Sequence, residues 1–156
     1  MTASDDPSAV FEAVVRANQY MVLATADVSG VPWASPVWFA TVDSWEFFWV
    51  SSPNARHSQN LAVRPELAIT IFDSGQPPGT GQGVYFSAQA FQVAEDEIDD
   101  GMAVFSAASQ HVGMRPWSRA DVVAPARHRL YRATAVERFV LSPRDERLAV
   151  SSRHVG

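Results

Sequence analysis

The sequence contains no cysteine, which excludes disulfide bonds, thiol nucleophiles and Cys-ligated metal. It contains no lysine either, so all 12 basic residues are Arg. A phosphate site in this chain must therefore use Arg, His, Ser or backbone N–H groups. The sequence also lacks an apolar run of membrane-spanning length, and its acidic first ten residues do not resemble a signal peptide. These absences predict a cytoplasmic protein that does not contact the membrane.

Several motifs of known chemistry are also missing. The four histidines have neither His-x-x-x-His nor His-x-Glu spacing, so no metal site is expected. No Gly-x-Ser-x-Gly segment indicates a serine hydrolase. The glycines of residues 79–83 precede an expected strand rather than a helix, which favours a hairpin loop over a nucleotide-binding loop. A net charge of -5 argues against a nucleic-acid partner.

The length and composition predict one globular domain over residues 1–156. Hydrophobic residues make up 47% of the 156 positions and charged residues 19%, which is enough apolar material for one sizeable core. We expect an N-terminal helix at about 7–19, a core at about 20–141 and a loose tail at 151–156. Asp6-Pro7 is a typical start for that helix, with a side-chain cap followed by proline.

The rest of the pattern indicates a mainly β protein with peripheral helices. Alternating or apolar runs predict six strands, at residues 20–26, 33–42, 45–50, 67–72, 84–93 and 129–141. Two more helices are expected at 54–63 and 95–110. The second and third strands read as a hairpin across Asp43-Ser44, and Pro36 favours an edge or a bulge for the second strand. Short connections between the strands predict a closed or partly closed antiparallel barrel.

The most informative stretch of the chain is residues 32–60. It combines two aromatic-rich strands with Ser51-Ser52 and Arg56-His57, where a helix begins. Strands of this kind provide a flat apolar wall, and a helix start favours an anion. A planar ring system with a phosphate, such as flavin mononucleotide (FMN), would suit such a surface. The alternative interpretation is that the aromatic residues form only core and subunit contacts.

Two segments of the chain resemble the pyridoxamine 5'-phosphate oxidase-like family of FMN-binding split β-barrels. The first is YMVLATADVSGVPWASPVWFA, and the second is FFWVSSPNARHSQNLAVRPELAITIFD. The resemblance extends over about residues 20–139. It implies a six-stranded antiparallel split β-barrel that forms a homodimer, with FMN bound at the subunit interface by residues of both chains.

The resemblance also implies roles for individual residues. Arg56 and His57 stand where the oxidases have an Arg-Lys pair that holds the flavin phosphate, and Asn60 stands at a structural position. Ser51 and Ser52 would reach the phosphate and the ribityl chain, and Tyr85 would approach the partner's flavin. The strand segment 35–38 would meet the isoalloxazine ring. The candidate cofactor-binding residues are Ser35, Pro36, Val37, Trp38, Trp49, Ser51, Ser52, Arg56, His57, Ser58 and Tyr85.

The C-terminal substrate signature of the true oxidases is missing, since the chain has only ARHRLYRATAVERF in its place. Pyridoxamine phosphate is therefore not the expected substrate. The loop 111–126, which contains Met114, Pro116 and Trp117, is expected to cover the substrate side instead.

The sequence thus predicts an FMN-dependent oxidoreductase that acts on an unknown small-molecule substrate, and no residue is assigned a catalytic role. One alternative is a deazaflavin-dependent reductase on the same fold, with the anionic tail of that cofactor near Arg16, Arg64 or Arg115. Others are a non-catalytic flavin- or haem-binding module and an empty structural barrel.

Overall fold

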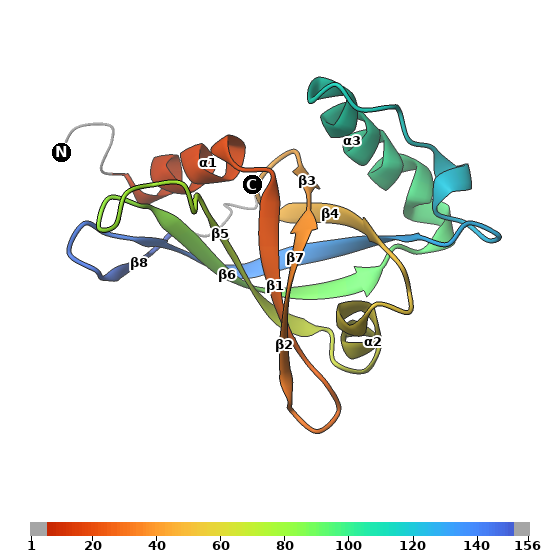
Figure 1. Cartoon of the computed structure of the whole chain (residues 1–156), viewed down its shortest axis with the longest axis horizontal. Coiled ribbons are helices and arrows are strands. Elements are labelled where there is room, and N and C mark those ends of the chain that lie inside the picture. The colour runs from red at the N-terminus through yellow and green to blue at the C-terminus, as the bar shows by residue number, and fades with distance from the viewer. Residues whose placement is uncertain (1–5, 152–156) are drawn as a thin grey trace.

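The computed structural model describes residues 6–151, which form a curved antiparallel sheet with helices around it (Figure 1). The strand order is β2-β1-β5-β6-β7-β4-β3, and β8 pairs with β7. The strands are β1 (Tyr20–Ala26), β2 (Pro32–Trp38), β3 (Ala40–Thr41), β4 (Glu46–Ser51), β5 (Glu66–Phe72), β6 (Gly83–Gln92), β7 (Arg129–Leu141) and β8 (Arg147–Ala149). The sheet curls into a half-barrel, so the predicted mainly β split-barrel fold is confirmed. The six long strands are those expected from the sequence, β3 is the end of the expected strand 33–42, and β8 is a short addition.

The predicted hairpin between the second and third strands is confirmed only for the last residues of the second strand. The expected strand 33–42 is divided at Phe39 into β2 and β3, and only β3 forms the hairpin with β4. β2 pairs along its whole length with β1, from Tyr20 opposite Trp38 to Ala26 opposite Pro32. The reason is the tight turn between them, where Asp27 Oδ1 accepts hydrogen bonds from the N–H groups of Ser29 (2.8 Å) and Val31 (3.0 Å). β2 lies at the edge of the sheet, as Pro36 predicted.

Buried aromatic residues fill the concave side of the sheet. Phe47 stacks on Phe86 with ring centres 4.7 Å apart, and Phe86 also meets Phe11 at 5.9 Å. Phe11 belongs to helix α1 (Pro7–Ala17), whose N-cap Asp6 accepts a hydrogen bond from the Ser8 N–H. Helix α1 therefore closes one end of the half-barrel, and the predicted N-terminal helix and its cap are confirmed.

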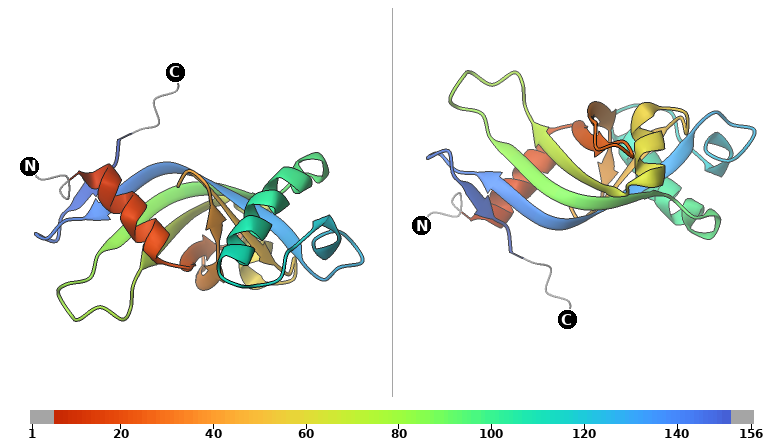
Figure 2. Two further views of the ribbon diagram at one scale, coloured as in Figure 1. Left: turned by 90° about the horizontal axis from the view of Figure 1, so that it is seen from above. Right: turned by 90° about the horizontal axis from the view of Figure 1, so that it is seen from below.

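The other two helices lie at the opposite end of the sheet. Helix α2 (Arg56–Val63) follows β4, and helix α3 (Ile98–His111) follows β6 after a short 3-10 turn, η1 (Glu95–Glu97). Figure 2 shows α1 over the end of the sheet near β8 and α3 over the other end. Helix α3 can approach β4 and β7 closely because Gly101 has no Cβ, and a Cβ there would lie 2.8 Å from Leu130 Cδ2. The segment after α3 contains a second 3-10 turn, η2 (Arg119–Asp121).

The loose tail expected at 151–156 lies almost wholly outside the described residues. No described helix is long and apolar enough to cross a membrane.

Candidate functional site

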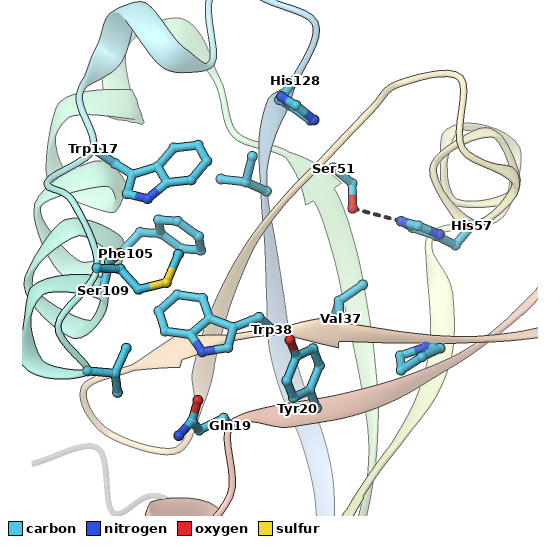
Figure 3. A pocket seen from close by; sticks show the side chains of 14 residues that line it. Gln19, Tyr20, Val37, Trp38, Ser51, His57, Phe105, Ser109, Trp117 and His128 are labelled. Atoms are coloured by element: carbon cyan, nitrogen blue, oxygen red, sulfur yellow. Dashed lines mark hydrogen bonds between the residues drawn. The ribbon is translucent and has the colours of Figure 1, made fainter.

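A pocket of about 540 Å³ lies between the β-sheet, α2 and α3 (Figure 3). Its walls come from the start of β1, the end of β2, the end of β4, the first turn of α2, α3 and the segment after α3. The lining residues are Gln19, Tyr20, Pro36, Val37, Trp38, Val50, Ser51, His57, Phe105, Ser109, Val112, Met114, Trp117 and His128. The volume is in the usual range for a small-molecule site.

The polar end of this pocket is built by Ser51 and His57. Ser51 ends β4, and the chain then turns through a bond of 3.1 Å from the Ala55 N–H to the Ser52 carbonyl and enters α2. This turn brings Nε2 of His57 to 2.9 Å from Oγ of Ser51. His57 is only 7% exposed, and burial lowers the pKa of its imidazole below the ordinary 6.5. His57 is therefore neutral at neutral pH and adds no positive charge to the site.

The aromatic end of the pocket consists of Trp38, Phe105, Val112, Met114 and Trp117. Trp38 meets Phe105 edge to face with ring centres 4.9 Å apart, and Phe105 meets Trp117 in the same way at 5.4 Å. The backbone N–H of Trp117 donates to Ser106 Oγ at 2.9 Å, which attaches this segment to α3. Figure 3 shows these rings on the α3 side, opposite the Ser51–His57 pair. The pocket thus has an aromatic end and a polar end.

The predicted site residues fall into three groups. Pro36, Val37, Trp38, Ser51 and His57 line the pocket, so the structure brings these together from three elements. A second group, of Ser35, Ser52, Arg56 and Ser58, neighbours them in the chain but does not line the pocket. The third group, of Trp49 and Tyr85, lies elsewhere.

Within the second group, Arg56 is exposed at the first position of α2, with its guanidinium carbon 4.4 Å from the centre of the Trp33 ring. Ser58, also in the first turn of α2, is 3% exposed, and its Oγ has no hydrogen-bond partner among the described residues. Asn60 is buried and donates through Nδ2 to Thr25 Oγ1 at 3.0 Å, a structural bond between α2 and β1.

Trp49 and Tyr85 lie outside this pocket for different reasons. Trp49 is fully buried in the core, where it stacks on Tyr131 with ring centres 5.6 Å apart. Tyr85 is on β6 and lines a separate groove of about 290 Å³ on the outer face of the sheet, together with Ala24 and Ala68. A contact between Tyr85 and a partner's flavin stays a prediction.

Sequence reasoning missed Gln19, Tyr20, Val50, Phe105, Ser109 and His128 as pocket residues. Phe105 and Ser109 are four residues apart and therefore share one face of α3, a spacing that the sequence already contains. Which wall that face meets is decided only by tertiary packing. Of the loop 111–126, Val112, Met114 and Trp117 line the pocket and Pro116 does not, and the expectation that this loop covers a substrate stays a prediction.

The curled sheet with this pocket at one end defines the class of protein. A family model described as pyridoxamine 5'-phosphate oxidase matches residues 8–141. The chain therefore belongs to that family, and the resemblance stated from the sequence is confirmed. A search of curated proteins found no match at the significance applied.

Solved structures with the same fold differ in what they bind. A haem-binding protein from Mycobacterium smegmatis has a TM-score of 0.70 and 20% identity, over 93% of this chain and 58% of that chain. The haem storage protein HutZ from Vibrio cholerae has a TM-score of 0.67 and 20% identity, over 86% of this chain and 94% of that chain. An FAD-binding protein from Mesorhizobium loti has a TM-score of 0.63 and 17% identity, over 83% of this chain and 89% of that chain. At these identities the likeness establishes the fold alone.

Proposed function

We propose that the chain binds FMN in this pocket and uses it as an oxidoreductase acting on a small molecule. The observation that carries the proposal is the junction of the edge strand β2, whose Pro36 and Val37 line the pocket, with the first turn of α2, where Ser51, His57 and Arg56 are adjacent. When bound, FMN would supply the hydride-transfer chemistry, while the protein binds and orients the reactants. A cytoplasmic location is part of the same proposal.

The residues present fit the chemical parts of FMN. Because His57 is neutral, Arg56 is the charged group at the start of α2 that can pair with a phosphate, together with the N–H groups of that helix turn. The Ser51 hydroxyl and the His57 ring offer hydrogen bonds to the ribityl chain. β2 is an edge strand, so its outer backbone groups at 35–38 meet no other strand of the described chain and can bond to a flavin ring.

The proposal includes a homodimer with the cofactor at the interface. It is supported by the outer face of β1, β5 and β6, where Ala24 and Ala68 stand exposed in register beside the groove that contains Tyr85. The small side chains of Ala24, Ala68 and Ser87 in this groove allow close contact with a second copy, and Arg147 also lines the groove. Light scattering after size exclusion should give a dimer mass. Ala68→Arg should lower the measured mass to that of the monomer. If the unaltered protein is itself monomeric, the proposed dimer is contradicted.

The test of the cofactor uses two ligands that differ only in the phosphate. FMN added to the purified protein should give flavin absorption bands that survive desalting. Arg56→Ala should weaken FMN binding by about 1.5–3 kcal/mol, roughly 10- to 150-fold, and leave riboflavin affinity unchanged. Arg64→Ala is the matched control, since Arg64 is also exposed and lies at the other end of α2. A protein that retains no FMN would refute the proposal, and competition with a deazaflavin cofactor would then decide that alternative.

A second candidate function is haem binding without catalysis. The specific observation is that two imidazoles, those of His57 and His128, line the same pocket, and His57 is in the neutral form that binds iron. A haemin titration that gives a Soret shift, abolished by His57→Ala or His128→Ala, would favour this function. Haemin binding unaffected by both variants would count against it.

A further inference from the structure

The aromatic end of the pocket carries an inference about the second reactant. Its members are Trp38, Phe105, Val112, Met114 and Trp117, and they come from β2, α3 and the segment that follows α3. Three of them present aromatic rings in successive edge-to-face contacts. Such a surface offers flat apolar area and ring edges to a planar ligand.

The positions of these rings are set before any ligand arrives. The guanidinium carbon of Arg115 lies 4.2 Å from the centre of the Trp117 ring, and Arg115 is itself bonded to Asp121 at 3.0 Å. Phe105 contacts Trp117 from α3, and the Trp117 N–H is bound to Ser106. Because Trp117 is held from three directions, little ordering of the indole is needed when a ligand binds.

The charge of the pocket is the second observation. No Asp, Glu or Arg side chain from the described part of the chain lines it, and the chain has no Lys. Arg115 does not line it, and the charge of Arg115 is balanced by Asp121. Since a charged group loses its hydration on entering such a site and finds no opposite charge there, a charged ligand is disfavoured.

We propose that this aromatic end is the substrate subsite and that it takes an uncharged, planar aromatic molecule. As a substrate assignment the inference rests on the proposed flavin function, and it specifies the class of molecule that function acts on. The anionic part of FMN belongs at the other end, beside Arg56. Discrimination against a phosphorylated or carboxylated substrate follows from the absence of a counter-charge, and preference for a planar ring follows from Trp38, Phe105 and Trp117.

The test uses two probes that share the naphthalene ring, one of them uncharged and the other anionic. Calorimetric titration of the FMN-loaded protein with 2-naphthol and with naphthalene-2-sulfonate should give at least a tenfold tighter Kd for the neutral naphthol. The measurement is repeated at high ionic strength, which screens the long-range repulsion from the net charge of -5. A sulfonate that binds as tightly as the naphthol would overturn the inference.

Two variants test the location of the subsite. Trp117→Ala should weaken naphthol binding about tenfold while FMN affinity is retained, and Trp117→Phe should recover most of the loss. Met114→Arg adds a positive charge at an exposed position of the aromatic end and should reverse the preference in favour of the sulfonate. Val136→Arg is the matched control, because Val136 is 61% exposed on β7 and does not line the pocket.

Separate results identify which proposal fails. Unchanged naphthol binding in Trp117→Ala, or displacement of naphthol by FMN, would refute a separate substrate subsite while leaving the flavin function intact. If the protein retains no FMN, the proposed function fails. The same two titrations on the flavin-free protein then decide whether this end selects neutral planar rings.

Discussion

The guanidinium carbon of Arg56 lies 4.4 Å from the centre of the Trp33 ring, so the edge strand β2 supports the first residue of α2. Trp33 is itself held in place, since its carbonyl oxygen accepts a hydrogen bond of 3.3 Å from Thr25 Oγ1. Thr25 in turn accepts a bond from Asn60 of α2. One connected set of contacts therefore orients the cation proposed to meet the flavin phosphate.

Replacement of Trp33 should weaken FMN binding indirectly. Trp33→Leu removes a cation–π contact worth about 0.5–1 kcal/mol at an exposed site, so FMN affinity should fall about two- to fivefold. Riboflavin has no phosphate, and its affinity should not change. Trp33→Phe keeps an aromatic face and should retain most of the FMN affinity. Equal losses for both ligands would show that Trp33 supports the flavin site as a whole rather than Arg56.

The buried His57 should make stability depend on pH. Its pKa in the folded protein is lowered by burial below the ordinary 6.5 of the unfolded chain. Above about pH 6.5 both states are neutral, and this residue adds no pH dependence. As the pH falls below that value the unfolded state takes up a proton first, so the free energy of unfolding decreases until the folded pKa is reached.

This dependence can be isolated with matched variants. Urea unfolding of His57→Gln between pH 7.5 and about pH 5 should show a shallower loss of stability than the unaltered protein. His111→Gln, at an exposed position, should keep the original slope. Identical slopes for His57→Gln and the unaltered protein would contradict the assignment of the pH dependence to His57.

Loss of the Ser51 hydroxyl should destabilise the fold. Ser51→Ala leaves Nε2 of the buried His57 without its 2.9 Å partner, which should lower the free energy of unfolding by about 1–3 kcal/mol. Ser52→Ala is the adjacent control. Its Oγ accepts only the exposed Asn54 N–H at 3.2 Å, and its loss should cost about 0.5 kcal/mol or less. Equal losses of unfolding free energy in the two variants would show that the Ser51–His57 bond stabilises the fold no more than the exposed Ser52 contact does.

Arg138 should contribute strongly to stability from the core of the barrel. Its guanidinium carbon is 3.7 Å from the centre of the Trp45 ring, and its Nη1 lies 3.8 Å from Glu12 Oε1. Arg138→Ala should therefore lower the free energy of unfolding by about 2–3 kcal/mol. Glu12→Gln should cost about 1 kcal/mol or less, because Glu12 is 36% exposed and its pairing is screened by water. A thermal or urea transition unchanged in Arg138→Ala would contradict this role.

Local sequence patterns predicted most of the fold because the signals are short in range. The long strands, the Asp6 cap and the turn at Asp27 depend on residues within a few positions of one another. The hairpin was predicted over the whole of residues 33–42, but only β3 forms it with β4, because the segment before Phe39 pairs with β1. The extent of the hairpin depends on where the strand is interrupted, at Phe39, and the surrounding barrel decides that position.

The same distinction applies to the candidate site. The sequence by itself determined the chemistry at the start of α2, where Ser51, Arg56 and His57 are close together in the chain, and it excluded thiol and lysine chemistry throughout. Only the tertiary structure decided that Phe105 and Trp117 close the aromatic end and that His57 is buried enough to be neutral. It also decided that Tyr85 and Trp49 lie outside the pocket. The physical reason is that burial, electrostatic environment and contacts between distant segments are properties of the packed chain, whereas caps, turns and strand periodicity are properties of neighbouring residues.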